Sequence, residues 1–150
     1  MSRVISITSG KGGVGKSNFV LNVGVCLAMM EHRVMILDAD LGLANIDVLM
    51  GLRTERTLED VVYNRADIRD IILKTDYKVD LIPGCSGTED MADLKKEQIQ
   101  ALVKKIATLS NDADFLLVDT ASGISTGVVS FLLSSPEVIV GVAPRRWRQP

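Results

Sequence analysis

The sequence predicts a doubly wound α/β fold built on a mostly parallel sheet. Two observations lead to this prediction. Short, continuously apolar segments rich in β-branched residues alternate with segments of helical periodicity, which is typical of strands that helices cover on both faces. A glycine-rich turn also separates the first predicted strand from the first predicted helix. With 150 residues, 47% hydrophobic and 24% charged, the chain has the size and composition of one globular domain.

The chain opens with a strand, a helix and a second strand. Residues 3–8 are a short β-branched strand that ends before a glycine. Residues 18–31 carry apolar side chains at helical spacing, and two cations follow them, as suits a helix C-terminus. Residues 33–38 are a second apolar strand. Residues 39–56 lack periodicity and are expected to form a loop, with a short apolar turn at 46–50.

Two short helices and a strand are predicted in the middle of the chain. Thr57 is expected to cap the first helix, with Asp60 three residues later approximating a capping box. Residues 67–73 form the second short helix. Residues 79–83 form a strand that the sequence Pro-Gly terminates.

The last part alternates helix and strand. Residues 94–109 are amphipathic and predict a helix, and residues 114–119 are a strongly apolar strand ending in aspartate. Residues 126–133 predict a helix and residues 137–143 the final strand. The alternation supports a sheet whose parallel strands are joined by helical crossovers.

Composition excludes several classes of protein. A formal net charge of -2 argues against a general polyanion-binding surface, so no direct nucleic-acid binding is expected. No apolar run approaches the roughly 20 residues that a membrane span needs, and the start is too short an apolar stretch for a signal peptide. Cys26 and Cys85 form no CxxC pair, which is typical of a reduced, cytoplasmic chain. Cys26 is expected to pack in the core.

The segment between the first strand and first helix satisfies the phosphate-loop pattern G-x-x-x-x-G-K-[ST]. Glycines let several backbone N–H groups point into one concavity, and the helix N-terminus adds positive partial charge. Lys16 can reach β- and γ-phosphates, and the Ser17 hydroxyl can bind Mg²⁺. The alternative is a glycine turn with an incidental lysine. The predicted nucleotide-binding residues here are Gly10, Lys11, Gly12, Gly13, Val14, Gly15, Lys16, Ser17 and Asn18.

Lys11 distinguishes this loop, because an ordinary phosphate loop needs no lysine there. With it, residues 11–17 resemble the deviant Walker A motif of the MinD/ParA family. The resemblance implies a P-loop NTPase fold of the SIMIBI type, ATP and Mg²⁺ as cofactors, and a homodimer that forms around Mg·ATP. It also implies that Lys11 reaches the phosphates bound by the partner subunit, a charge supplied in trans like an arginine finger. Lys11 and Lys16 are therefore candidate catalytic residues; a solvated surface lysine is the alternative for Lys11.

Two aspartates follow the second predicted strand, at the edge where open α/β sheets bind ligands. This segment resembles switch I of the MinD/ParA family, the first loop that responds to nucleotide. The resemblance implies that Asp38 lies near Mg²⁺ and its water shell, and that Asp40 orients or activates the attacking water as a catalytic residue. Alternatively, either aspartate caps the next turn.

The strand at 114–119 ends in the Walker B pattern, so Asp119 is predicted to hold Mg²⁺ through water, beside Ser17 and Asp38 as metal residues. The following Thr-Ala-Ser-Gly-Ile resembles switch II, the second nucleotide-responsive loop, where the Gly123 N–H can contact the γ-phosphate. The segments at 119–124 and 81–87 resemble the FlhG/FleN branch, which regulates flagellar number and placement. An N-terminal partner-binding motif of many FlhG members has no counterpart here.

The resemblance covers roughly residues 2–144. We therefore expect 1–144 to be the N-terminal part of a MinD/ParA-like ATPase domain, and 145–150, which holds three arginines and Trp147, to be an atypical and foreign tail of a truncated product. The alternative is a basic tail that meets acidic lipid or nucleic acid.

The expected function is an ATP-binding, slowly hydrolysing molecular switch that binds or releases a protein partner. That partner would be a flagellar regulator or GTPase, or a cell-division factor, with peripheral membrane contact only through a C-terminal region. Division-site or chromosome-partition positioning and a non-hydrolysing remnant remain alternatives. So does an iron–sulfur reductase or cluster carrier, for which Cys85 is the one plausible ligand.

Overall fold

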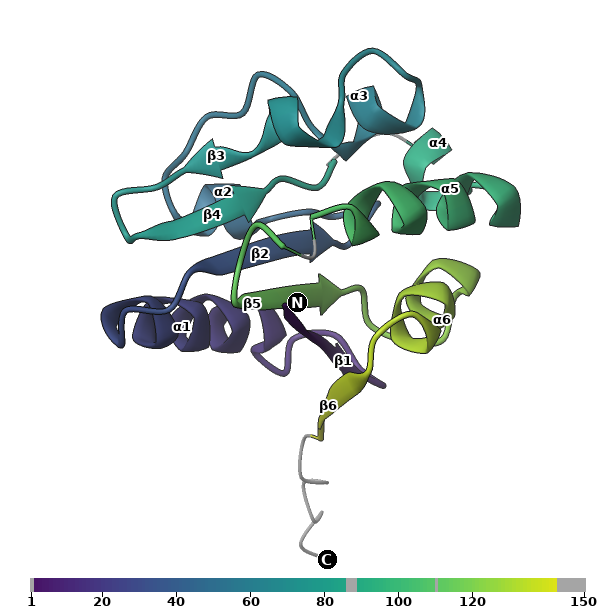
Figure 1. Cartoon of the computed structure of the whole chain (residues 1–150). Helices are drawn as coiled ribbons and strands as arrows, with labels where there is room; N and C mark the ends of the chain where they lie inside the picture. Colours follow the sequence, from purple (N-terminus) through teal and green to yellow (C-terminus); the bar gives the residue numbers. More distant parts are fainter. Residues whose placement is uncertain (1, 86–88, 110, 143–150) are drawn as a thin grey trace, which may run out of the picture.

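A six-stranded sheet organises the computed structural model, which describes residues 2–85, 89–109 and 111–142 (Figure 1). The strand order is β3-β4-β2-β5-β1-β6, with every pair parallel except the antiparallel β3 and β4. The doubly wound, mostly parallel α/β fold predicted from the sequence is confirmed. The strands are β1 (Arg3–Ser9), β2 (Val34–Ala39), β3 (Leu73–Lys74), β4 (Val79–Ile82), β5 (Phe115–Thr120) and β6 (Glu137–Gly141).

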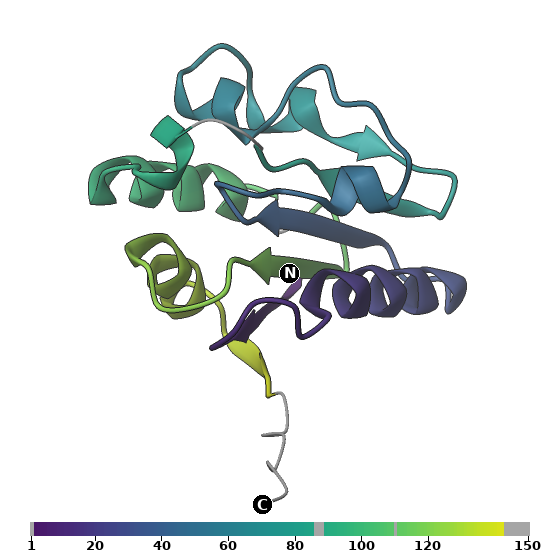
Figure 2. The same ribbon diagram turned by 180° about the vertical axis from the view of Figure 1, so that it is seen from behind.

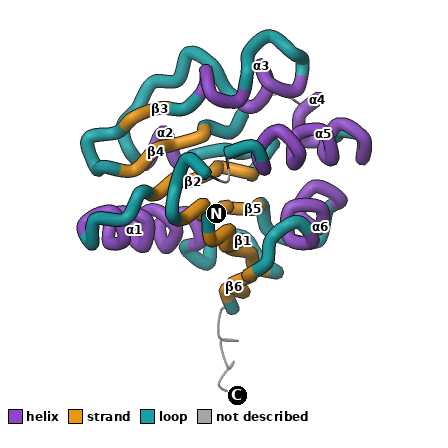
Figure 3. The backbone as a smooth tube through the Cα atoms, in the orientation of Figure 1, coloured by secondary structure: helices purple, strands orange, loops and turns teal. Residues whose placement is uncertain are grey.

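Helices cover both faces of the sheet, and Figures 1 and 2 show α1 on one side with α5 and α6 on the other. The helical segments are α1 (Lys16–Met29), α2 (Ile46–Leu49), α3 (Leu58–Val62), the 3₁₀ turn η1 (Ile68–Ile71), α4 (Glu89–Ala92), α5 (Lys96–Ala107) and α6 (Thr126–Leu133). Figure 3 shows the long loops that join the short segments between β2 and β4.

The central strands are apolar on both faces because each face has its own core. On β2, Met35 and Leu37 pack with α3, α5 and α6, while Val34 and Ile36 pack with α1 and α2. Leu117 on β5 points to the α1 side, opposite its neighbours. Successive side chains of a strand face opposite ways, so a strand between two helical layers must be apolar throughout.

The bounds of three predicted helices were wrong. The helix predicted at 94–109 is α5, which spans Lys96–Ala107. Helix α1 begins at Lys16 and ends at Met29, each two residues earlier than predicted. Glu31, with a φ of +68°, lies in the turn that follows the helix. Residues 67–73 hold only the η1 turn, because Ile72 is extended and Leu73 already pairs with Leu81 in β3. The short helix α4 was not predicted. The capping box at Thr57 is confirmed: Thr57 N–H donates to Asp60 Oδ2 at 3.0 Å, and Glu59 N–H donates to Thr57 Oγ1 at 3.3 Å.

Cys26 was wrongly expected in the core. Its side chain is exposed, because the stripe of α1 that faces the sheet is formed by Val20, Gly24 and Ala28. Cys26 lies two residues from the last two of these, which on a helix is the opposite side. Cys85 is the buried cysteine, and its thiol donates to Glu59 Oε2 at 3.2 Å.

No helix in the described ranges is long and apolar enough to cross a membrane. The end of the last predicted strand and the predicted atypical tail at 145–150 lie outside the described residues.

Candidate functional site

The phosphate loop joins β1 to α1 and leaves its backbone donors available. Gly13 and Gly15 have φ of +72° and +89°, values that a residue with a side chain rarely adopts. Gly15 is the N-cap of α1 and supplies no capping side chain, so the first-turn N–H groups of α1 have no side-chain acceptor. The Ser9 hydroxyl donates to the Lys11 carbonyl at 2.6 Å and pins the start of the loop. This geometry is that of an anion-binding helix N-terminus.

The two loop lysines differ in exposure and in their surroundings. Lys11 is exposed and Lys16 half-buried. Neither takes part in an ion pair among the residues that the structure describes. Lys16 lies close enough to Asp119 for its charge to lower the pKa of that carboxyl group. Asn18, next on the helix, is exposed, and its carbonyl accepts from Asn22 Nδ2 at 2.7 Å.

Asp119 stands at the end of β5 in the middle of the site. It is 2% exposed, in register with Ile7 on one neighbouring strand and with Asp38 on the other. Burial raises the pKa of the Asp119 carboxyl, and the Asp40 charge adds to that shift; a hydrogen bond from the Ser17 hydroxyl and the Lys16 charge oppose it. Its Oδ1 atom is buried without a hydrogen-bond partner. An orphaned carboxylate oxygen of this kind is suited to a cation or to water bound to one.

Asp38 caps the turn that follows its strand, which was the alternative to a metal role. Its Oδ2 accepts from the backbone N–H groups of Asn45 and Ile46 at 2.8 and 2.9 Å, where α2 begins, and its Oδ1 accepts from Asp40 N–H at 3.3 Å. The pKa of Asp38 is raised to about 7, mainly by burial and in smaller part by the Asp119 charge, although the three N–H bonds act to lower it. The metal role of Asp38 stays a prediction, since its carboxylate already anchors the loop after β2.

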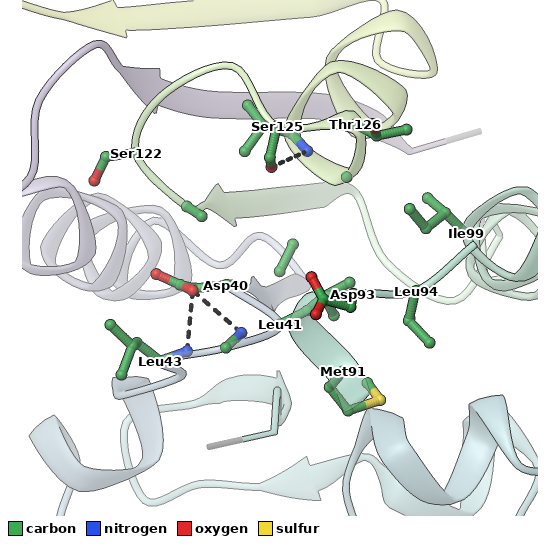
Figure 4. A pocket seen from close by; sticks show the side chains of 15 residues that line it. Asp40, Leu41, Leu43, Met91, Asp93, Leu94, Ile99, Ser122, Ser125 and Thr126 are labelled. Carbon is green, nitrogen blue, oxygen red and sulfur yellow. Dashed lines mark hydrogen bonds between the residues drawn. The ribbon is translucent and has the colours of Figure 1, made fainter. Parts of the chain in front are cut away.

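Asp40 lies at the rim of a cavity of about 850 Å³ (Figure 4). One of its oxygens, Oδ1, accepts from Leu43 N–H at 3.1 Å and from Gly42 N–H at 3.4 Å. The loop after β2 forms one wall of the cavity, and the loop after β5 with the start of α6 forms another. Figure 4 shows the Asp40 side chain on the first wall and Ser122, Ser125 and Thr126 on the second.

The loop after β5, which resembles switch II, is tied to the phosphate loop through its backbone. Gly123, with φ of +94°, donates its N–H to the Ser9 carbonyl at 3.0 Å. The predicted contact of this amide with a γ-phosphate stays a prediction, and the amide has an acceptor in the structure as it stands. Thr120, the last residue of β5, donates its hydroxyl to the Ile7 carbonyl at 2.9 Å and locks the two strands at the same point.

The structure therefore brings the phosphate loop, Asp119 and the two aspartates after β2 to one edge of the sheet. Two contributors were not predicted. Ser122 lines the cavity and faces the phosphate loop. At Gly84 a β-carbon would lie 2.6 Å from the Asp38 carbonyl oxygen and 2.7 Å from Ala44 Cβ, so only glycine fits behind Asp38. The Pro-Gly sequence after β4, which predicts the end of that strand, was also the available signal for such a close approach.

Among the described residues, no three His, Cys, Asp or Glu side chains gather to hold a metal ion by themselves. Cys85, the one candidate iron–sulfur ligand, is 4% exposed and is bonded to Glu59, so the structure gives that alternative no support.

Comparison with known proteins places these features in a wider group. Residues 2–148 match the family described as "AAA domain". The chain is 46% identical over 140 residues to the antiactivator FleN of Pseudomonas aeruginosa, covering 93% of this chain and 50% of the relative. It is 36% identical over 144 residues to the flagellum site-determining protein YlxH of Helicobacter pylori, covering 95% and 49%.

Among solved structures, the septum site-determining protein MinD of Pyrococcus horikoshii, complexed with Mg-ADP, superposes with a TM-score of 0.85 at 33% identity. That match covers 97% of this chain and 59% of the solved chain. The chain spans about half the length of the curated relatives it matches.

Proposed function

The chain belongs to the MinD/ParA family of P-loop ATPases, and on that premise we propose that it binds Mg·ATP at residues 10–17 and acts as an ATP-driven switch. One observation carries the proposal. The Asp119 carboxyl group has a buried, unpartnered Oδ1 atom and lies near Lys16, in a loop whose N–H groups are arranged for phosphate. A site with a positive loop on one side and an orphaned carboxylate oxygen on the other fits a metal-bound polyphosphate.

The residues present fit magnesium. Mg²⁺ prefers oxygen ligands, keeps several waters and is held by one or two protein oxygens together with substrate phosphates. The Ser17 hydroxyl lies close enough to Asp119 to lower the pKa of that carboxyl group, so one small cation can meet both. Bound Mg²⁺ would neutralise charge on the transferred phosphoryl group. Asp38 would not contact the metal itself but would hold in place the loop that carries Asp40.

Hydrolysis and dimerisation are the next parts of the proposal. Within the described ranges, the Oδ2 atom of Asp40 has no hydrogen bond. The Asp40 charge raises the pKa of Asp119, so Asp40 is close enough to the site to orient water. The Lys11 side chain is exposed, so it is free to reach phosphates bound by a second copy. Both assignments follow the family resemblance and the exposure of the two side chains.

For the cellular role, we propose regulation of flagellar number or placement. The support is the similarity to FleN and YlxH, whose names describe flagellar regulators. Division-site positioning is the second candidate, supported by the likeness to MinD of Pyrococcus horikoshii. The partner would be a protein of the matching system, and a cytoplasmic location follows from either role.

Nucleotide binding is tested by calorimetry and thermal shift with Mg·ATP on the 150-residue chain. We expect saturable binding and a rise in melting temperature, since a ligand that binds only the folded state stabilises it. Lys16→Ala should abolish both, whereas Lys104→Ala, an exposed lysine on α5, should leave both unchanged. A folded wild-type chain with no Mg·ATP binding would refute the proposal.

Phosphate release separates a switch from a non-hydrolysing remnant. The wild-type chain should release phosphate from Mg·ATP slowly, and Asp40→Ala should reduce that rate by at least tenfold. Equal rates in the two proteins, with nucleotide binding intact, would leave binding without hydrolysis as the function of this chain.

A further inference from the structure

Ser122 lies on the loop after β5 and faces the phosphate loop. A β-carbon placed on Gly12 would lie 3.4 Å from Ser122 Oγ, so the hydroxyl lies beside the phosphate loop at Gly12. The same side chain lines the 850 Å³ cavity whose other wall carries Asp40 (Figure 4). Ser122 therefore lies between the phosphate-binding backbone and the carboxylate proposed to orient water.

The Ser122 hydroxyl is available for a ligand. Its side chain is exposed, and within the described ranges no hydrogen bond of its hydroxyl is recorded. The neighbouring hydroxyls differ: Thr120 donates to the Ile7 carbonyl, and Ser125 accepts from Val128 N–H as the N-cap of α6. Ser122 is thus the hydroxyl of this loop that folding has not already used.

Backbone contacts hold the loop that carries this hydroxyl in place. Gly123 N–H donates to the Ser9 carbonyl at 3.0 Å, and Ser9 in turn donates its hydroxyl to the Lys11 carbonyl. The loop that carries Ser122 is therefore fixed against the start of the phosphate loop before any nucleotide arrives. The Gly123 amide would have to break its hydrogen bond to Ser9 before it could donate to a phosphate, whereas the Ser122 hydroxyl would only exchange a bound water for the phosphate.

We propose that Ser122 is the residue that distinguishes ATP from ADP in this chain, by donating its hydroxyl hydrogen bond to a γ-phosphate oxygen. This inference rests on the proposed function, because it requires a nucleotide on the phosphate loop. ADP lacks the group that Ser122 contacts, so the hydroxyl contributes to the affinity for ATP alone. A hydrogen bond to a charged acceptor is stronger than one between neutral groups, so its loss should be measurable.

The test compares Mg·ADP with Mg·AMPPNP, a non-hydrolysable ATP analogue, by calorimetry on the full chain. Ser122→Ala should weaken AMPPNP binding about tenfold, the lower end for a hydrogen bond to a charged group, and change ADP binding less than about twofold. Ser122→Thr keeps the hydroxyl and should restore the preference for AMPPNP. Ser125→Ala removes a hydroxyl from the same cavity wall and should leave the ratio of the two affinities unchanged.

The outcomes are distinguishable. If Ser122→Ala stays folded and its ratio of AMPPNP to ADP affinity equals that of wild type, the inference about Ser122 is wrong while the proposed function stands. The same conclusion follows if Ser122→Ala weakens both nucleotides equally, or if Ser122→Thr fails to restore the ratio. If the wild-type chain binds neither nucleotide, the proposed function fails and takes this inference with it.

Discussion

Asp38 makes the stability of the ligand-free chain depend on pH in a direction opposite to that of most paired carboxylates. The residue is 1% exposed, and burial raises its pKa from an ordinary 3.8 to about 7, with the Asp119 charge adding to the shift. The folded chain therefore holds a proton on Asp38 over a range of pH in which the unfolded chain has lost it. Asp38→Asn removes that proton-binding group and is the perturbation we propose.

The sign and size follow from linkage. Because the pKa is higher in the folded state, the folded state binds more protons between the two pKa values, and stability falls as pH rises through this window. Between about pH 5 and about pH 8, a shift of this size lowers the free energy of unfolding by roughly 2.5 kcal/mol. For a domain of this length, that corresponds to roughly 5–10 °C in melting temperature.

The asparagine variant keeps most of the native contacts. An amide oxygen in place of Oδ2 still accepts from Asn45 and Ile46 N–H, and only the 3.3 Å contact with Asp40 N–H is lost. Urea unfolding followed by circular dichroism, with EDTA present and no nucleotide, measures both proteins across the pH range. Wild type should lose stability relative to Asp38→Asn as pH rises. Asp76→Asn, on the turn before β4, serves as the control.

If the wild-type and Asp38→Asn curves stay parallel from about pH 5 to about pH 8, Asp38 is ionised throughout in the folded chain. The three N–H bonds would then outweigh burial, and the reasoning from burial would be refuted.

Three further substitutions test local packing by the same urea assay. Gly84→Ala should destabilise the chain by roughly 1–3 kcal/mol, because its β-carbon meets the Asp38 carbonyl oxygen at 2.6 Å; an unchanged midpoint would mean that the backbone yields freely. Gly127→Ala on α6 meets nothing closer than 3.9 Å and should stabilise the chain by about 0.5–1 kcal/mol; a loss of stability would contradict the open space seen there. Thr57→Ala should cost about 1 kcal/mol through loss of the α3 cap while leaving Mg·ATP binding unchanged; weaker binding would show that this cap reaches the site.

Local signals were sufficient for most of the fold. Strands β2 and β5 were predicted because each is a continuous apolar run, and burial of both their faces is the physical reason for those runs. The start of α1 was missed by two residues because Gly15, in a left-handed conformation, lets the helix begin inside the motif. Strand β3 has two residues and exists only through its pairing with β4, a contact that no local pattern encodes.

The candidate site also contains residues that the sequence predicts and residues that only the folded structure reveals. The phosphate loop and Asp119 were predicted because the chemistry needs those residue types at those places in the chain. The state of Asp38 could not be predicted, since a metal neighbour and a loop anchor require the same residue after a strand, and only the distances to Asn45 and Ile46 separate them. Ser122 was not predicted, because only its proximity to Gly12 in the folded chain marks it out, and the two residues are more than a hundred positions apart in the sequence.

Ser9 shows why these distant segments act as one site. The order β2-β5-β1 places the carboxyl ends of three parallel strands side by side, with Asp119 paired to Asp38 on one side and to Ile7 on the other. Ser9, at the end of β1 and 1% exposed, then uses its hydroxyl to hold the Lys11 carbonyl and its own carbonyl to hold Gly123. A single buried serine therefore sets both the start of the phosphate loop and the position of the loop that carries Ser122. Because both bonds leave one residue, Ser9 links the start of the phosphate loop directly to the loop that carries Ser122.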